Sequence, residues 1–101
     1  MSTTVLHISC SELCELEQIQ TEVLVSIVEH GIAKPVEGRR ETDWIFEASA
    51  VPWIKKAVRL AADLEIDWFA VALLIELMQQ KEQLERENAC YRSQLERFME
   101  S

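Results

Sequence analysis

The stretch SCSELCELEQIQTEVLVSIVEHG, residues 9–31, decides the fold, because it holds two short helical patterns separated by a tight break. Its first signal is a capping box formed by Ser9 and Glu12, in which each side chain satisfies a backbone N–H group of the other residue. A capping box marks the start of a helix, so the pattern predicts a helix over residues 10–17.

The second half of this stretch predicts another short helix packed against the first. Leu13 and Leu16 give the first helix an apolar stripe, and Leu24 begins a similar pattern after the break. We expect Thr21 to cap the second helix and Gly31 to end it, because glycine readily adopts the left-handed conformation of a helix stop. Two short helices joined this tightly predict a helix-turn-helix.

The rest of the chain predicts a β wing and two further helices. Pro35 prevents continuation of the second helix, and residues 36–47 combine a charged turn with β-prone residues, which favours a small hairpin or wing. A third helix is predicted over residues 49–64, and Asp67 is expected to cap a last helix that reaches the end of the chain. The expected fold is therefore mainly α-helical: a winged helix-turn-helix with a small β wing and a long C-terminal helix. Its helix-turn-helix, wing and third helix occupy residues 1–66 and its association helix residues 67–101.

Composition limits the classes of function. The 101 residues include 10 Lys and Arg against 18 Asp and Glu, which gives a formal net charge of -8. Before Lys34 the chain has five acidic residues and no Lys or Arg. A phosphate backbone is repelled by such a field, so nucleic acid is not the expected partner.

The last helix is predicted to pair with a second copy of the chain. Hydrophobic residues recur at three- and four-residue intervals over almost four heptads, the signature of a coiled coil. The a and d positions are Leu74, Leu77, Lys81, Leu84, Asn88, Tyr91, Leu95 and Phe98. A polar Asn at an a position favours a dimer over larger bundles. The alternative is one amphipathic helix that folds against its own domain.

The sequence offers little for catalysis or metal binding. His7, Cys10, Cys14 and His30 are a nominal zinc set, but a Cys-x3-Cys spacing inside a helix lacks the tight turn of zinc knuckles. No Gly-rich phosphate loop is present, and no nucleophile has an evident base beside it. We therefore expect neither an enzyme nor a metal or cofactor site.

Cysteine usage and hydropathy indicate the compartment. Three cysteines suit free thiols in a reducing compartment better than a disulfide framework. No apolar run approaches the length of a membrane span, and residues 1–7 lack the pattern of a signal peptide. These features predict a cytoplasmic protein without a membrane segment.

The order helix-turn-helix, wing and long dimer helix is typical of winged transcription regulators, so DNA binding was the natural alternative function. A recognition helix needs Arg, Lys, Asn or Gln facing phosphates and base edges. The second helix offers Glu22, Ser26, Glu29 and His30 instead, and only Arg39 and Arg40 of the wing suit DNA. The reversed sign of this surface favours a protein partner with a basic face.

The sequence also resembles the CbpM-type chaperone modulators, which are relatives of MerR-like regulators. The similarity covers most of the chain and is strongest from Thr42 onward. It is carried by TDWIF at residues 42–46, KAVRL at 56–60, DLEIDW at 63–68 and AVAL at 70–73. The segment from Glu82 to Phe98 is similar to the terminal coiled coil of that family.

This resemblance implies a MerR-like fold and an inhibitor that binds the J-domain of a CbpA- or DnaJ-like co-chaperone and blocks its stimulation of Hsp70. The alternative function is a MerR-like DNA-binding transcriptional regulator. We predict that the partner surface consists of Glu12, Glu15, Glu22 and Glu29, with Trp44 as an apolar anchor. Tryptophans are more often core residues than binding anchors, so a purely structural role for Trp44 stays open.

Overall fold

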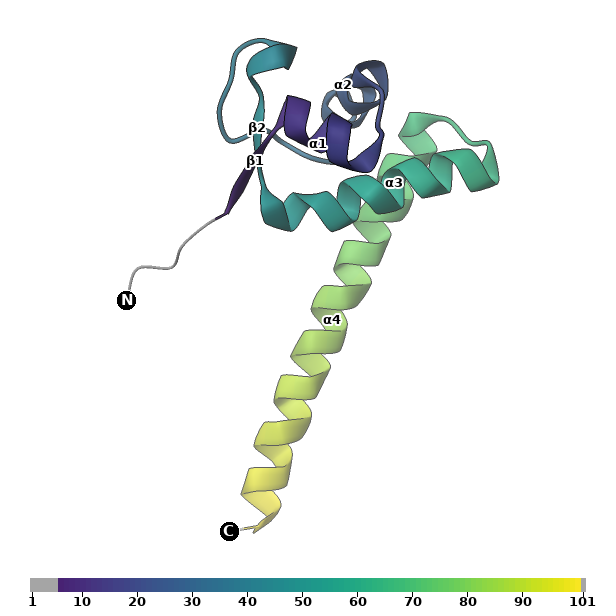
Figure 1. Cartoon of the computed structure of the whole chain (residues 1–101). Helices are drawn as coiled ribbons and strands as arrows, with labels where there is room; N and C mark the ends of the chain where they lie inside the picture. Colours follow the sequence, from purple (N-terminus) through teal and green to yellow (C-terminus); the bar gives the residue numbers. More distant parts are fainter. Residues whose placement is uncertain (1–5, 101) are drawn as a thin grey trace.

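The computed structural model describes residues 6–100 and is mainly helical, with one small antiparallel sheet (Figure 1). Residues 1–5 and residue 101 lie outside this range. The prediction that residues 1–7 lack a signal-peptide pattern therefore falls largely outside the described residues. The elements are β1 (His7–Ser9), α1 (Cys10–Glu17), α2 (Thr21–Glu29), the 3-10 turn η1 (Glu41–Asp43), β2 (Ile45–Glu47), the 3-10 turn η2 (Ala48–Ala50), α3 (Val51–Leu64) and α4 (Trp68–Glu100).

The first helix has the predicted bounds and cap. The backbone N–H of Glu12 donates to Ser9 Oγ at 3.2 Å, and the Ser9 hydroxyl in turn donates to Glu12 Oε1 at 3.0 Å. The Glu12 carboxylate thus accepts the Ser9 hydroxyl. The capping-box pattern had predicted that it accepts the backbone N–H of Ser9. That backbone belongs to β1, which pairs with β2.

The turn between the two helices differs from the prediction by one residue. Gln20 is the N-cap of α2, and Thr21 is already helical. Ile19 is buried in the connection, which brings the chain into α2 earlier than the cap pattern predicted. Gly31 ends the helix in the left-handed region with φ 74°, as expected.

The wing strand pairs with a distant segment and only slightly with its own loop. β2 runs antiparallel to β1, with Ile8 opposite Phe46, whereas the local hairpin is reduced to one bridge between Glu37 and Ile45. The predicted small hairpin or wing over residues 36–47 is therefore present as a wing, and its main strand pairing is with His7–Ser9. Gly38 makes the loop possible, because a Cβ there would lie 2.4 Å from the carbonyl oxygen of Asp43.

The third and fourth helices begin and end at residues that the sequence marks. The 3-10 turn η2 takes up Ser49, so α3 starts at Val51 and not at Ser49. It ends at Leu64, and the following C-cap residue Glu65 adopts φ 52°. Asp67 then caps α4 by accepting the backbone N–H of Ala70 at 2.9 Å.

One apolar core joins the helix-turn-helix, the sheet, α3 and the first turns of α4. Its largest fully buried side chains are Phe46, Leu13, Leu24, Ile27, Ile54, Ile75 and Val71. Leu16, which the helical pattern placed on the apolar stripe with Leu13, is 70% exposed because the core lies on one side of α1 only. Beyond Met78, α4 leaves the body of the molecule and projects away from it (Figure 1).

Candidate partner-binding surface

The four acidic residues predicted to bind a partner are all exposed. Glu12 and Glu15 lie on α1, and Glu22 and Glu29 lie on α2. Within residues 6–100 none of these four carboxylates forms an ion pair. Their charge is therefore not neutralised by a neighbouring base and acts on the surrounding solvent.

Glu17, the third acidic residue of α1, has a different role. Glu17 Oε2 lies 3.5 Å from the ammonium Nζ of Lys55 on α3. This ion pair ties the helix-turn-helix to α3, so the charge of Glu17 is locally compensated. No local sequence pattern predicts this pairing, because the two residues are far apart in the chain.

Trp44 lies at the edge of the core and close to the acidic surface. It is half-buried, and its ring meets that of Phe46 edge-on, with centroids 6.2 Å apart and an interplanar angle of 76°. Its carbonyl oxygen accepts the backbone N–H of Cys10 at 2.8 Å. The indole is thus packed against Phe46, and part of it remains exposed.

Two shallow hollows relate Trp44 to α1. A hollow of about 410 Å3 is lined by Glu15 and Thr42, among others, and a second of about 520 Å3 is lined by Thr42, Trp44 and the wing arginines. Thr42 is shared, so Glu15 and Trp44 border neighbouring parts of one surface. Glu22 and Glu29 line neither hollow, so the four predicted acids are spread over two helices and do not converge on one pocket.

The Cys10 thiol of α1 is not suited to nucleophilic chemistry. Burial raises the pKa of the Cys10 thiol to about 11, and the nearby Cys14 adds to the shift. A thiol that stays protonated at neutral pH is a weak nucleophile and a weak metal ligand. Among the described residues, no group of three or more His, Cys, Asp or Glu is arranged to hold a metal ion.

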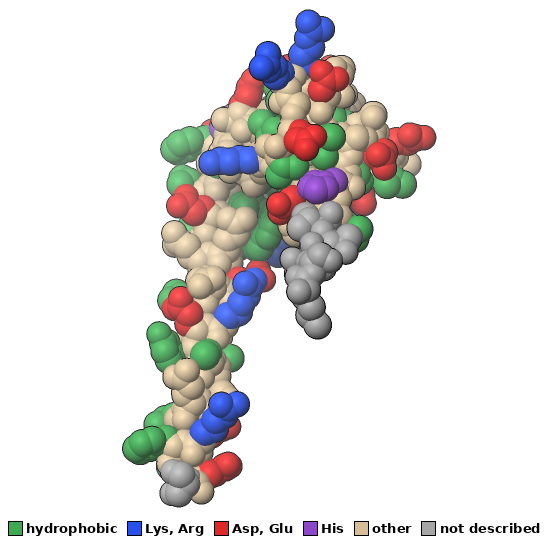
Figure 2. All heavy atoms as spheres, turned by 90° about the vertical axis from the view of Figure 1, so that its left-hand side faces the viewer, with side chains coloured by type: hydrophobic (Ala, Val, Ile, Leu, Met, Phe, Trp, Pro, Cys, Tyr) green, Lys and Arg blue, Asp and Glu red, His purple; other side chains and the backbone are tan. Residues whose placement is uncertain are grey.

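The predicted association stripe lies on the part of α4 that leaves the body. In the view of Figure 2, hydrophobic side chains recur along one edge of the projecting helix, and some Lys or Arg side chains are visible along the other. The exposed fractions are 60% for Leu77, 58% for Leu84, 64% for Tyr91, 59% for Leu95 and 80% for Phe98. Leu74 is half-buried at the body, and the polar members Lys81 and Asn88 are exposed.

Charged pairs flank this stripe on the same helix. Lys81 Nζ lies 3.7 Å from Glu85 Oε1, and Arg86 Nη2 lies 2.7 Å from Glu82 Oε1. Such pairs four residues apart support an exposed helix by a few tenths of a kcal/mol each. The apolar edge is therefore the part of α4 whose burial would stabilise the protein most.

Comparison with known proteins places this architecture in a family. The model of the MerR helix-turn-helix regulatory protein family matches residues 8–93. The chaperone modulatory protein CbpM of Pseudomonas putida strain KT2440 is 38% identical over 99 residues, which span 98% of this chain and 97% of that protein. The chain belongs to the CbpM family of chaperone modulatory proteins.

Further CbpM relatives show the same coverage. The CbpM of Pseudomonas entomophila strain L48 is 36% identical over 97 residues, 96% of this chain and 95% of that protein. The CbpM of Escherichia coli O1:K1 / APEC is 33% identical over 99 residues, 98% and 97% of the two chains. The resemblance stated from the sequence is thereby confirmed, and the role it supports is that of a chaperone modulator.

The CbpM relatives are named as modulators and not as enzymes. Within residues 6–100, no helix combines the length and the hydropathy required to cross a membrane.

Proposed function

We propose that the protein binds the J-domain of a CbpA- or DnaJ-like co-chaperone and inhibits its stimulation of Hsp70 in the cytoplasm. The observation that carries this proposal is the acidic helix-turn-helix: Glu12, Glu15, Glu22 and Glu29 are exposed and form no ion pair in the described part of the chain. J-domains carry a strongly basic helix that docks on Hsp70. An acidic surface attracts that helix and competes with Hsp70 for it.

Charge and apolar contact have separate tasks in this proposal. Exposed carboxylates act over long range and speed the encounter, so their effect falls as salt rises. Trp44 provides the apolar contact, because a rigid indole that is already half-buried loses little conformational entropy when a partner covers it. The acids are thus assigned to the association rate and Trp44 to the lifetime of the complex.

We further propose that the protein is a homodimer through α4. The exposed apolar edge from Leu77 to Leu95 projects beyond the body, where no other described element covers it. A second copy supplies an identical edge, which is the simplest way to remove this surface from water. Each dimer then carries two acidic surfaces.

The direct test is calorimetric titration of the purified protein with the J-domain of its own organism's CbpA-like protein at low and high salt. We expect binding that weakens with salt. The double variant Glu22→Lys with Glu29→Lys should lower the affinity about tenfold or more at low salt. A matched control, Glu76→Lys with Glu96→Lys on α4, changes the net charge equally and should leave the affinity close to that of the parent protein.

The same titration separates this proposal from DNA binding, which the helix-turn-helix family match makes the natural alternative. Duplex DNA should produce no signal, because the described residues before Lys34 include no base to contact phosphates. DNA binding without J-domain binding would overturn the proposal. An unchanged affinity of the Glu22 and Glu29 variant would refute the acidic surface while leaving J-domain binding intact.

A further inference from the structure

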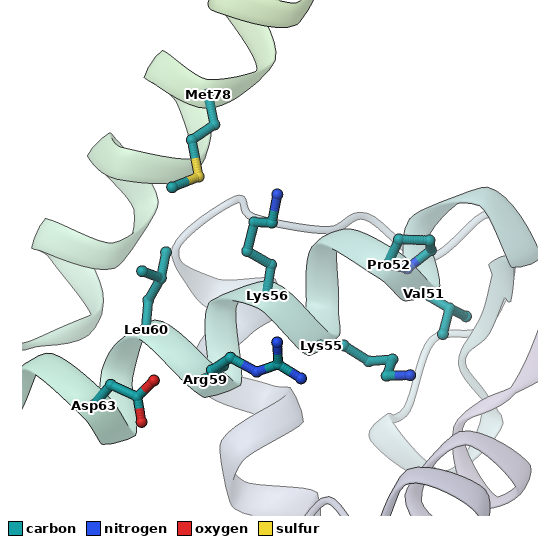
Figure 3. A pocket seen from close by; sticks show the side chains of 8 residues that line it. All are labelled: Val51, Pro52, Lys55, Lys56, Arg59, Leu60, Asp63 and Met78. Carbon is teal, nitrogen blue, oxygen red and sulfur yellow. The ribbon is translucent and has the colours of Figure 1, made fainter.

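A hollow of about 500 Å3 lies between α3 and α4 (Figure 3). Its walls combine apolar and cationic side chains: Leu60 from α3 and Met78 from α4 on one side, and Lys55, Lys56 and Arg59 along α3. This volume is within the range of sites that accept a few side chains of a ligand. The hollow is open to solvent and is not part of the surface proposed above.

The apolar wall of the hollow is formed by two half-buried side chains. Leu60 and Met78 point toward one another across the gap between the helices (Figure 3). Both pack against the core on one side and remain open to the hollow on the other. Methionine is flexible and adapts to differently shaped apolar partners, so this wall suits a Leu- or Met-sized side chain.

The cationic wall is unusual in a chain of net charge -8. Lys55 is paired with Glu17, and Lys56 lies 5.2 Å from the centre of the Trp53 ring, so both stems are held in place. Arg59 is exposed and forms no ion pair within residues 6–100. Three cations at positions i, i+1 and i+4 of one helix line this hollow, with the carboxylate of Asp63 at its rim and that of Glu17 paired with Lys55.

We propose that this hollow binds an acidic peptide segment of another protein that carries a Leu- or Met-sized apolar side chain. The carboxylates would meet Arg59, and the apolar side chain would enter between Leu60 and Met78. Arg59 suits this role because its guanidinium binds a carboxylate through two parallel hydrogen bonds. The basic helix of a J-domain is repelled by the same cations, so this segment belongs to a partner of opposite charge.

A fluorescence anisotropy titration tests the proposal with the full chain. The probe is a fluorescein-labelled peptide of alternating Leu and Asp, and a peptide of alternating Leu and Lys is its control. We expect saturable binding of the acidic peptide, weakened by salt, and none of the basic peptide. Arg59→Glu should raise the Kd about tenfold, the equivalent of about 1.4 kcal/mol.

Two variants separate this site from general charge effects. Arg97→Glu changes the net charge equally but lies at the far end of α4, so its Kd should stay at the parent value. Leu60→Ala should weaken binding of the acidic peptide, provided circular dichroism shows an unchanged fold. No binding of the acidic peptide, or an equal loss in Arg59→Glu and Arg97→Glu, would overturn the proposal.

The outcome is independent of the proposed function. Arg59→Glu should retain J-domain affinity, whereas Glu22→Lys with Glu29→Lys should retain affinity for the acidic peptide. If self-association of the protein, followed by sedimentation, were lost in Arg59→Glu, the occupant would be a second copy of the chain, and the proposal of a separate partner would be wrong.

Discussion

Truncation of Leu84 to Ala is the sharpest test of how this protein assembles. Leu84 is 58% exposed and lies at the centre of the apolar edge of α4. Leu→Ala removes about three methylene-sized groups, worth about 2.4 kcal/mol when fully buried. Because 58% of the residue is exposed in the protomer, association can gain about 1.4 kcal/mol of this from each copy.

A symmetric dimer contains this side chain twice. The expected loss is therefore about 2.8 kcal/mol per dimer, which raises the dimer dissociation constant about a hundredfold. The fold of the protomer should not change, since Leu84 lies outside the core. Sedimentation velocity over a range of protein concentrations measures the dissociation constant, and circular dichroism checks the helix content.

A matched control uses the same substitution elsewhere. Leu16→Ala on α1 removes the same atoms from a residue that is 70% exposed but lies off the apolar edge of α4. Its dimer dissociation constant should equal that of the parent protein. If Leu84→Ala dimerised as tightly as Leu16→Ala, the apolar edge of α4 would not be the interface, and the homodimer argued from it would fail.

Two further predictions concern the fold and its titration. Asp67→Ala removes the acceptor for the N–H of Ala70 and should cost about 1 kcal/mol, seen as a Tm several degrees lower, whereas Asp67→Asn should keep most of the stability. Because burial raises the pKa of Cys10 to about 11, the unfolded chain releases the thiol proton at lower pH than the folded chain, so stability should fall between pH about 9 and about 11. The urea midpoint of Cys10→Ala should fall less over that window, and an equal fall would contradict the assignment.

Local chemistry explains which parts of the fold were predictable. The bounds of α1 follow from the Ser9 cap, and the stop of α2 follows from Gly31, because each signal acts within one turn of helix. The partner of β2 was not predictable, since a three-residue strand has too little alternation to reveal that it pairs with His7–Ser9. The exposure of Leu16 likewise depends on where the core lies, which no local pattern contains.

The same division applies to the candidate site. The acidic character of the first helices is a property of composition, so the sequence predicts it directly. Which acid is compensated is a tertiary fact: Glu17 meets Lys55 of α3, while Glu15 faces solvent. The cationic hollow was not predicted from the sequence because residues 34–66 contain equal numbers of basic and acidic residues. The spacing of Lys55, Lys56 and Arg59 does place them at neighbouring positions of one helix, which was the available signal.

The separation of acidic and basic side chains onto different surfaces determines which partners this small protein can bind at the same time. A summed charge of -8 predicts that every acidic partner is repelled, yet short-range fields dominate within a Debye length of about 8 Å at physiological salt. In the α3–α4 hollow an acidic segment would lie against Arg59, whereas Glu22 and Glu29 of α2 do not line this hollow. Salt should weaken binding at both surfaces, because both rely on screened charges. A mutation at one surface should change the affinity of that surface only. This difference distinguishes two binding sites from one diffuse electrostatic attraction. In the case of a diffuse attraction, charge reversal at either surface would change the affinity for both partners.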